Sequence, residues 1–298
     1  MRRTGSSTLK GVALAAAVVA AFGAWVVAGH RILNAPSVSL SQSERSVFSP
    51  GGQDGVLERV FEVVEPTHRY LVDLGAGDGV RGSFSRNLIA NHGWRGVLVE
   101  SDPELGAALR ETYAGQGAVR TLQAGIYPGD IEIQLERADV PPVLDLLIVT
   151  LHANDWHVWR AIQEFRPKVV QIEYNAAFVP PQTMVIDYHP LNYWDGSLYF
   201  GASIQSLFAL GQKKGYELVY ADRSGTSLYF VDRRYYPRFG LADNDPATLF
   251  VPRAGFPLIK PSTLWRYVRP DGRPWEEAES ELVRKDVRIR RTFVVGEL

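Results

Sequence analysis

The most constraining feature of the sequence is a short apolar run that leads into three closely spaced glycines. Residues 70–74 read Tyr-Leu-Val-Asp-Leu, and Gly75, Gly77 and Gly79 follow at alternate positions. A short apolar run bounded by glycines is typical of a buried strand. Glycines permit a sharp turn and let backbone amides approach a ligand closely. The pattern therefore predicts a strand of an α/β fold that ends in a binding loop.

Further apolar runs alternate with stretches of helical periodicity. Strands are predicted at 70–74, 96–100, 121–123, 144–151 and 168–173, and helices at 56–64, 85–91, 103–113, 155–165 and 202–214. Because strands that alternate with helices pair in parallel, we expect a doubly wound, mainly parallel, Rossmann-like sheet. Two last strands, at 216–221 and 227–232, flank a short turn, which predicts an antiparallel hairpin at one edge of the sheet.

The N-terminal region carries a candidate membrane segment. Residues 11–29 contain no charged side chain and consist mostly of Ala and Val, after a basic tail at residues 1–10. At ~1.5 Å per residue, this run spans roughly 28 Å, close to the thickness of the hydrocarbon core. A cleaved signal peptide has a similar layout, but its apolar region is usually shorter. We therefore expect a transmembrane helix that acts as a single-pass anchor.

The remainder of the chain divides by composition. Residues 30–52 are rich in Ser and Pro and are predicted to be a linker, residues 53–238 form the α/β domain, and residues 239–298 are a Pro- and Arg-rich extension. The chain has no Cys, which excludes disulfides and thiolate chemistry, and its net charge of −1 argues against a nucleic-acid partner. Aromatic residues concentrate between Trp156 and Tyr236, which indicates either a well-packed core or an aromatic wall.

The glycine loop fits two kinds of nucleotide site. Gly77, Gly79 and Gly82 satisfy the dinucleotide pattern of NAD enzymes, but that match begins several residues after the strand. The alternate-glycine pattern that starts at Gly75 begins at the strand end and is better placed. Glu100 ends the next strand, where a carboxylate can accept hydrogen bonds from both ribose hydroxyls. Since NAD and S-adenosylmethionine (SAM) both contain ribose, Glu100 does not choose between them, and a solvated strand end remains the alternative.

Several segments together resemble the FkbM-type class I methyltransferases. The similar segments are Gln53-Asp-Gly-Val-Leu-Glu-Arg-Val-Phe, Val72-Asp-Leu-Gly-Ala-Gly-Asp-Gly-Val, Gly93-Trp-Arg-Gly-Val-Leu-Val-Glu, Ile172-Glu-Tyr-Asn and Tyr199-Phe-Gly-Ala-Ser-Ile-Gln-Ser-Leu. The resemblance covers roughly residues 49–232. It implies the SAM-binding fold and O-methylation of a sugar or another small hydroxylated acceptor. The cofactor-binding residues that we predict are Asp73, Gly75, Ala76, Gly77, Asp78, Gly79, Glu100 and Ser101.

The chain departs from its relatives after the fourth strand. Where they tend to carry several acids, this sequence reads Ile148-Val-Thr-Leu-His-Ala-Asn-Asp, so that His152 stands at an acidic position and only Asp155 remains. Too few carboxylates are left for a hard-cation site, and the histidines have no zinc spacing, so we predict no metal. A histidine titrates near neutrality, which makes His152 a candidate general base. Asp155 is a further candidate catalytic residue. Glu173 and Asn175 end the next strand, where Glu173 is a candidate for orienting a substrate hydroxyl and Asn175 for donating a hydrogen bond to it. The alternative is that these side chains cap strand ends and loops.

Three functions remain open at this stage. The first is a membrane-anchored, SAM-dependent methyltransferase with a small-molecule acceptor. The second is a catalytically degenerate binding or scaffold protein, which the substituted acids favour. The third is an NAD enzyme. Arg2, Arg3 and Lys10 favour a cytoplasmic N-terminus and an external domain, whereas SAM is a cytosolic metabolite, so the side of the membrane on which the domain lies stays open. The sequence makes no prediction of the oligomeric state.

Overall fold

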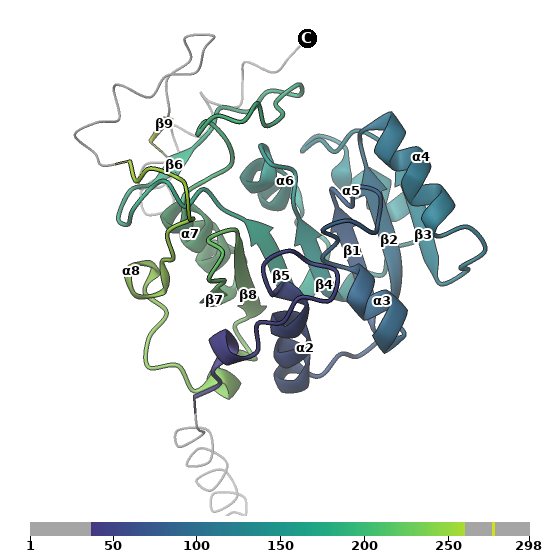
Figure 1. Cartoon of the computed structure of the whole chain (residues 1–298). Helices are drawn as coiled ribbons and strands as arrows, with labels where there is room; N and C mark the ends of the chain where they lie inside the picture. The colour runs from purple at the N-terminus through teal and green to yellow at the C-terminus, as the bar shows by residue number, and fades with distance from the viewer. Residues whose placement is uncertain (1–36, 260–275, 278–298) are drawn as a thin grey trace, which may run out of the picture.

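A computed structural model describes residues 37–259 and 276–277 of the chain, and it contains one large sheet of seven strands in the order β3-β2-β1-β4-β5-β8-β7 (Figure 1). The strands are β1 (Tyr70–Leu74), β2 (Arg95–Glu100), β3 (Val119–Gln123), β4 (Val143–Val149), β5 (Arg166–Glu173), β7 (Tyr216–Ala221) and β8 (Ser227–Asp232). Strands β1 to β5 pair in parallel, and β8 is antiparallel to both β5 and β7. The predicted doubly wound, mainly parallel sheet with an antiparallel edge hairpin is confirmed.

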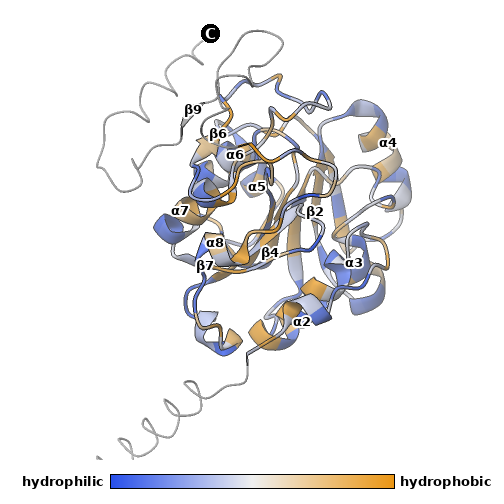
Figure 2. Ribbon diagram, turned by 60° about the vertical axis from the view of Figure 1, so that its left-hand side comes forward, coloured by the Kyte–Doolittle hydropathy of each residue, from blue (hydrophilic) through white to orange (hydrophobic). Residues whose placement is uncertain are grey.

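Helices cover both faces of the sheet. They are α2 (Gln53–Val64), α3 (Arg86–His92), α4 (Pro103–Thr112), α5 (Ile131–Arg137), α6 (Asp155–Ala161), α7 (Ile204–Lys214) and the short α8 (Pro246–Leu249). Side chains of α2, α3 and α4 share one apolar cluster with Leu71 and Leu98, and those of α5, α6 and α7 share another with Val72 and Val97. Successive strand residues thus face opposite layers, which explains why the central strands are mostly apolar on both faces (Figure 2).

Local sequence signals set the helix ends. The side chain of Asp102 accepts hydrogen bonds from the amides of Glu104 and Leu105, and Pro103 occupies the first turn of α4. Helix α5 was not predicted, because it has seven residues and only Ile131 and Leu135 are buried, too few to show a helical period. Predicted and observed ends otherwise differ by a few residues, the largest difference being α6, which ends at Ala161 rather than near Phe165.

The described part of the predicted linker is packed against the domain. Leu40, in the short 3-10 helix Leu40–Gln42, is buried, and the amide of Val38 donates to the carbonyl of Phe239 at 2.9 Å. The carboxylate of Asp54 accepts hydrogen bonds at 2.8 Å from the amides of Val47, Phe48 and Ser49. The polar composition that resembles a linker therefore supplies internal hydrogen bonds, and the prediction is wrong for residues 37–52.

The domain also continues past residue 238. The 3-10 helix Tyr236–Phe239 spans the predicted boundary. The hydroxyl of Tyr174 donates to the carbonyl of Val251 at 2.5 Å, and the amide of Ile259 donates to the carbonyl of Ala177 at 2.6 Å. Strand β9 (Glu276–Glu277) pairs with β6 (Met184–Val185). The predicted anchor at 11–29 lies outside the described residues. Within residues 37–259 and 276–277, no helix has the length and apolar character that crossing a membrane requires.

Candidate functional site

The glycine loop turns at the carboxyl end of β1. The amides of Gly75 and Ala76 donate to the carbonyl of Val99 at 2.9 and 3.1 Å, which fixes the loop to β2. Gly75 has φ +92°, and a Cβ there would lie 2.1 Å from the carbonyl oxygen of Thr150. Gly77 has φ +60°, but nothing lies within 4 Å of the position its Cβ would take. Gly75 is therefore required by packing, whereas Gly77 leaves open space beside the loop.

Glu100 closes the loop from the tip of β2. One carboxylate oxygen accepts the Gly77 amide at 2.7 Å, and the other accepts the Asp102 amide at 2.8 Å. The side chain is largely buried yet borders the main cavity of the sheet edge. Glu100 is thus held in place by backbone donors, with lone pairs left for a ligand.

The two aspartates of the loop have different surroundings. Asp73 is buried, its Oδ1 has no hydrogen-bond partner, and burial raises its pKa to about 7, with the nearby charge of Glu100 acting in the same direction. Asp78 accepts hydrogen bonds from the amides of Val80 and Arg81 and pairs with the Arg81 guanidinium at 2.8 Å. Burial alone would raise the pKa of Asp78, but these bonds hold it below its usual value. Asp78 therefore stabilises the turn.

A cavity of 670 Å³ lies at the carboxyl ends of β1, β2 and β4, within the size range of ligand sites. It is lined from three sides, by the glycine loop, by the loops after β2 and β3, and by the loops after β4 and β6. Its lining residues include Gly75, Gly77, Glu100, Ser101, Gly125, Tyr127, Thr150, His152, Asn154 and Trp194. Of the predicted cofactor residues, Gly75, Gly77, Glu100 and Ser101 reach this cavity, whereas Asp73, Ala76, Asp78 and Gly79 are not among its lining residues.

His152 reaches the cavity from the tip of β4. It has φ +57°, which is uncommon for a residue with a Cβ. Its Nδ1 lies 2.7 Å from a carboxylate oxygen of Glu173, at the tip of β5. The hydrogen bond to Glu173 raises the pKa of His152 to about 9, and the charges of Glu173 and Asp155 add to this effect. His152 is therefore protonated near neutral pH, so the general base that we expected would form only in alkaline solution.

Asp155 and Asn175 hold the loops around this pair. The Asp155 carboxylate accepts the amides of Leu151 at 2.8 Å and Ala153 at 3.0 Å, and burial raises its pKa to about 7. Asn175 is fully buried and donates from its amide nitrogen to the carbonyls of Leu198 and Phe200 at 2.8 and 2.9 Å. Its amide oxygen accepts the Ala177 amide. Both residues support the site from behind, and the prediction that Asn175 donates to a substrate is wrong because its donors are taken.

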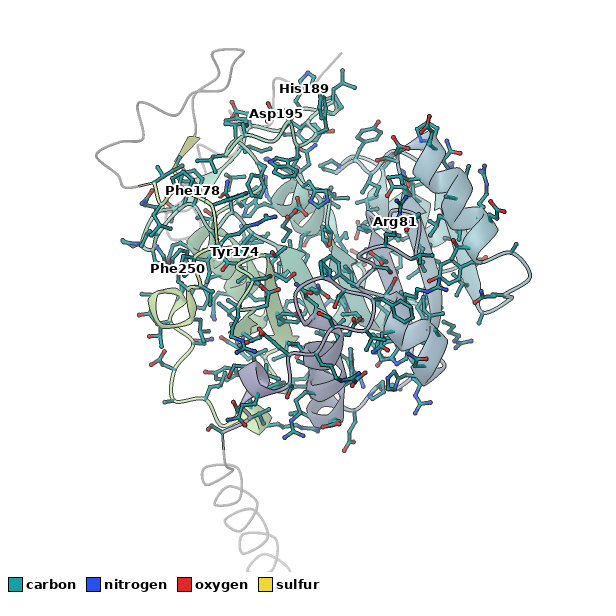
Figure 3. All side chains as sticks on the ribbon, in the orientation of Figure 1. Arg81, Tyr174, Phe178, His189, Asp195 and Phe250 are labelled. Carbon is teal, nitrogen blue, oxygen red and sulfur yellow. The ribbon has the colours of Figure 1, made fainter. Side chains whose placement is uncertain are left out.

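Two features of the site were not predicted. The loop at 187–198 covers the cavity beside His152 and carries Trp194, whose ring centroid is 6.4 Å from that of His152. Figure 3 shows His189 and Asp195 of this loop at the top of the molecule. Arg253, from the predicted extension, approaches the free oxygen of Glu173 at 3.9 Å. Neither segment has a periodic pattern, and only the local abundance of aromatic residues pointed to the loop.

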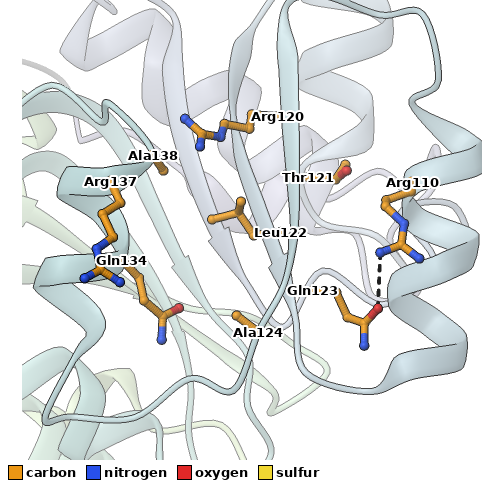
Figure 4. Close-up of a pocket in the computed structure, with 9 residues that line it drawn as sticks. All are labelled: Arg110, Arg120, Thr121, Leu122, Gln123, Ala124, Gln134, Arg137 and Ala138. Atoms are coloured by element: carbon orange, nitrogen blue, oxygen red, sulfur yellow. Dashed lines mark hydrogen bonds between the residues drawn. The ribbon is translucent and has the colours of Figure 1, made fainter.

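The outer edge of the sheet carries a second cavity, separate from the first. It has a volume of 440 Å³ and wraps around β3, where Arg110 donates to Gln123 at 3.2 Å (Figure 4). None of the predicted site residues lines it. Within the described part of the chain, no group of three or more His, Cys, Asp or Glu side chains is placed to hold a metal ion.

Comparisons with known proteins give remote structural likenesses. No family model matches the sequence, and no curated protein matches it significantly. The N-terminal domain of EvdMO1, solved with S-adenosylhomocysteine (SAH) and D-fucose, is 16% identical over 60% of this chain and 82% of that one, with a TM-score of 0.41. TYW2 of M. jannaschii, solved in complex with AdoMet, is 17% identical over 63% of this chain and 79% of that one, with a TM-score of 0.34. TehB of Haemophilus influenzae is 16% identical over 60% of this chain and 62% of that one, with a TM-score of 0.36. Likenesses at this level do not assign an activity to this chain.

Proposed function

We propose that the protein is a SAM-dependent methyltransferase of the FkbM type that O-methylates a sugar or another small hydroxylated acceptor. One observation carries this proposal: a single cavity joins the glycine loop and Glu100 to His152, which is paired with Glu173. In open α/β sheets, ligands bind at the carboxyl ends of the strands. The cavity therefore has a nucleotide-binding side and a side with a titratable group.

The residues present fit SAM. Gly77 has open space where its Cβ would be, so the loop backbone can approach a ligand closely. Glu100 keeps acceptor capacity for ribose hydroxyls, and Ser101 lies beside it on the cavity wall. The loop after β3, with Gly125 and Tyr127, borders the same space and supplies an apolar surface for the adenine ring of SAM. These contacts would place the cofactor across the tips of β1 and β2.

The cofactor supplies a methyl group already activated by its sulfonium charge, so the protein has mainly to bind, align and deprotonate. His152 uses Nδ1 for Glu173, so Nε2 is the nitrogen left for the acceptor hydroxyl. When His152 is neutral, its Nε2 would accept the hydroxyl proton of the acceptor, and the bound cofactor would supply the methyl group to the acceptor oxygen. Because the pKa of His152 is about 9, the rate of transfer rises with pH up to that value.

Isothermal titration of the full-length chain in detergent or nanodiscs with SAM tests the cofactor assignment. We expect binding in the wild type and a loss of about tenfold or more in Glu100→Ala, since a carboxylate that accepts two hydroxyls contributes charge-assisted hydrogen bonds. Glu104→Ala is the matched control, because Glu104 is exposed on α4 and lies outside the cavity. A folded wild-type chain that gives no heat with SAM would refute the proposal. Binding without transfer to any hydroxylated acceptor would favour a degenerate binding protein.

The membrane anchor at residues 11–29 is a further part of this proposal, supported by the uncharged run and its length. A reporter fused to the C-terminus, active on only one side of the membrane, tests the orientation. We expect the domain on the cytoplasmic side, since SAM is available there, despite the basic N-terminal tail. A reporter active only outside the cell would contradict catalysis with cytosolic SAM.

A further inference from the structure

Five exposed large apolar side chains line the main cavity. Leu191, Tyr193 and Trp194 retain 72%, 71% and 40% of their possible exposure, and all three line the cavity. Leu105 and Tyr127 are also exposed large apolar residues of the same cavity. Single exposed apolar residues are normal on protein surfaces. A group of them that borders one cavity is typical of a binding surface.

The five residues belong to two sides of the cavity. Leu105 and Tyr127 follow β2 and β3, beside Glu100, where the proposed cofactor would lie. Leu191, Tyr193 and Trp194 lie in one loop on the other side, where the Trp194 ring is 6.4 Å from the His152 ring. We call these three residues the apolar rim. The rim therefore borders the acceptor side of the site.

Three side-chain hydrogen bonds hold the loop that carries the rim. The Asn192 amide nitrogen donates to the Asp187 carbonyl at 2.7 Å, and that of Asn154 donates to the His189 carbonyl at 3.0 Å. The Trp194 indole donates to the Ser197 carbonyl at 2.8 Å. These bonds tie the polar groups of the loop to each other and to Asn154, while the apolar side chains of the rim are exposed at the cavity mouth. This arrangement gives the loop a defined shape with an apolar outer surface.

The chemistry across the site changes from polar to apolar over a short distance. The floor of the cavity is formed by the polar residues Thr150, His152 and Asn154, whereas the rim has one aliphatic and two aromatic side chains. A small, fully polar acceptor would occupy the floor and leave the rim in water. An acceptor that covers both surfaces has a hydroxylated part and an apolar part.

We propose that the acceptor is a small amphiphilic molecule whose hydroxyl group lies against His152 and whose ring or alkyl substituent packs on the apolar rim. The proposal rests on the methyltransferase function proposed above and specifies its substrate class. Trp194 is the central contact, because an aromatic face buries a large apolar area at low entropic cost and accepts the flat face of a ring. Tyr193 and Leu191 extend the surface outward.

The test uses two probes that differ only in their apolar part, phenyl β-D-glucopyranoside and methyl β-D-glucopyranoside. Each is titrated by calorimetry into the full-length chain in nanodiscs with saturating SAH, and titrations into empty nanodiscs are subtracted. We expect the phenyl glucoside to bind about tenfold more tightly than the methyl glucoside, because of the additional aromatic contact. Trp194→Ala should remove most of this difference, and Trp194→Phe should restore part of it.

The matched control is Ile133→Ala, because Ile133 is 48% exposed on α5 and does not line the cavity. This variant should keep the full preference for the phenyl glucoside. Equal affinities of the two glycosides for the wild type, or an unchanged preference in Trp194→Ala, would overturn the proposal. Equal affinities are also the result expected if the rim rests on a lipid bilayer. A wild-type chain that does not bind SAH would instead refute the methyltransferase assignment. The failure of the acceptor proposal and the failure of the methyltransferase proposal are therefore distinguishable.

Discussion

The substitution Glu173→Gln separates the charge of Glu173 from its shape. Glutamine has nearly the same volume as glutamate and can still accept a hydrogen bond from Nδ1 of His152. In the wild type this nitrogen lies 2.7 Å from the carboxylate. It removes the negative charge that stabilises the imidazolium. The pKa of His152 should therefore fall from about 9 toward its ordinary value of 6.5.

The size of the change follows from the contacts of His152. The hydrogen bond to Glu173 is the largest influence, burial acts against it, and the charges of Glu173 and Asp155 add to the increase. Asp155 remains in the variant, so the pKa should not fall below 6.5 by much. At pH 7 the protonated fraction would drop from roughly 99% to about a quarter. Since the folded pKa is raised, the charged pair stabilises the fold below pH 6.5, and this contribution is lost as the pH rises through about 9.

Two measurements report the change. Ring-proton NMR of histidine follows His152 directly, and the signal is assigned as the one missing from His152→Gln. Under the proposed function, the pH dependence of methyl transfer follows the same group, and its midpoint should move to lower pH in Glu173→Gln, with higher relative activity at neutral pH. Glu104→Gln, at an exposed position on α4, serves as the control and should leave both profiles unchanged. A wild-type midpoint near 6.5 that does not respond to Glu173→Gln would refute the pairing of charges inferred from the structure.

Two further predictions concern the glycine loop and its strand. Burial raises the pKa of Asp73 from 3.8 to about 7, so the free energy of unfolding should fall by up to about 4 kcal/mol as pH rises from about 4 to 7. In urea unfolding, Asp73→Asn should weaken this dependence of the unfolding free energy on pH, and an unchanged dependence would contradict the prediction. Gly75→Ala would place a Cβ 2.1 Å from the Thr150 carbonyl oxygen at φ +92°, which should destabilise the fold by roughly 1–3 kcal/mol. Thermal unfolding measures this loss, with Gly117→Ala as the control, because its Cβ would meet nothing within 4 Å.

Periodicity made the sheet predictable. The central strands are apolar on both faces because helices cover both, and such runs stand out against the polar turns between them. The positions of the glycine loop and of Glu100 were predictable for a related reason, since the loop directly follows one apolar strand and Glu100 ends the next. Helix α5 and the folded segment at residues 37–52 were not, because their stability comes from a few contacts, such as Ile131 and Asp54, that have no local pattern.

The candidate catalytic residues were predictable as a group but not by role. Parallel pairing places Val149 of β4 beside Ile172 of β5, so the residues that follow, including His152 and Glu173, meet at one edge. Sequence position alone does not show which polar atoms face a cavity. Asp155 carries a carboxylate like that of Glu173, yet its oxygens accept from loop amides, and the amide nitrogen of Asn175 donates to loop carbonyls. The protonation of His152 was also inaccessible, because it depends on a partner 21 residues away.

His152 stands where the FkbM-type sequences tend to carry an acid, and this adds a positive charge to the cavity that Glu173 offsets. A sulfonium cofactor is cationic, and a protonated His152 on the same cavity would repel it. Glu173 lies 2.7 Å from His152 and cancels most of this charge. Glu173→Gln should therefore weaken binding of SAM while the imidazolium persists, at pH values below about 6, by several-fold at low salt. SAH lacks the sulfonium charge, so its affinity should change little in the same titration. A parallel loss of affinity for SAM and SAH would indicate a distorted site and contradict the electrostatic role. A loss confined to SAM would show that the charge of Glu173 makes the positive charge of His152 compatible with the cofactor.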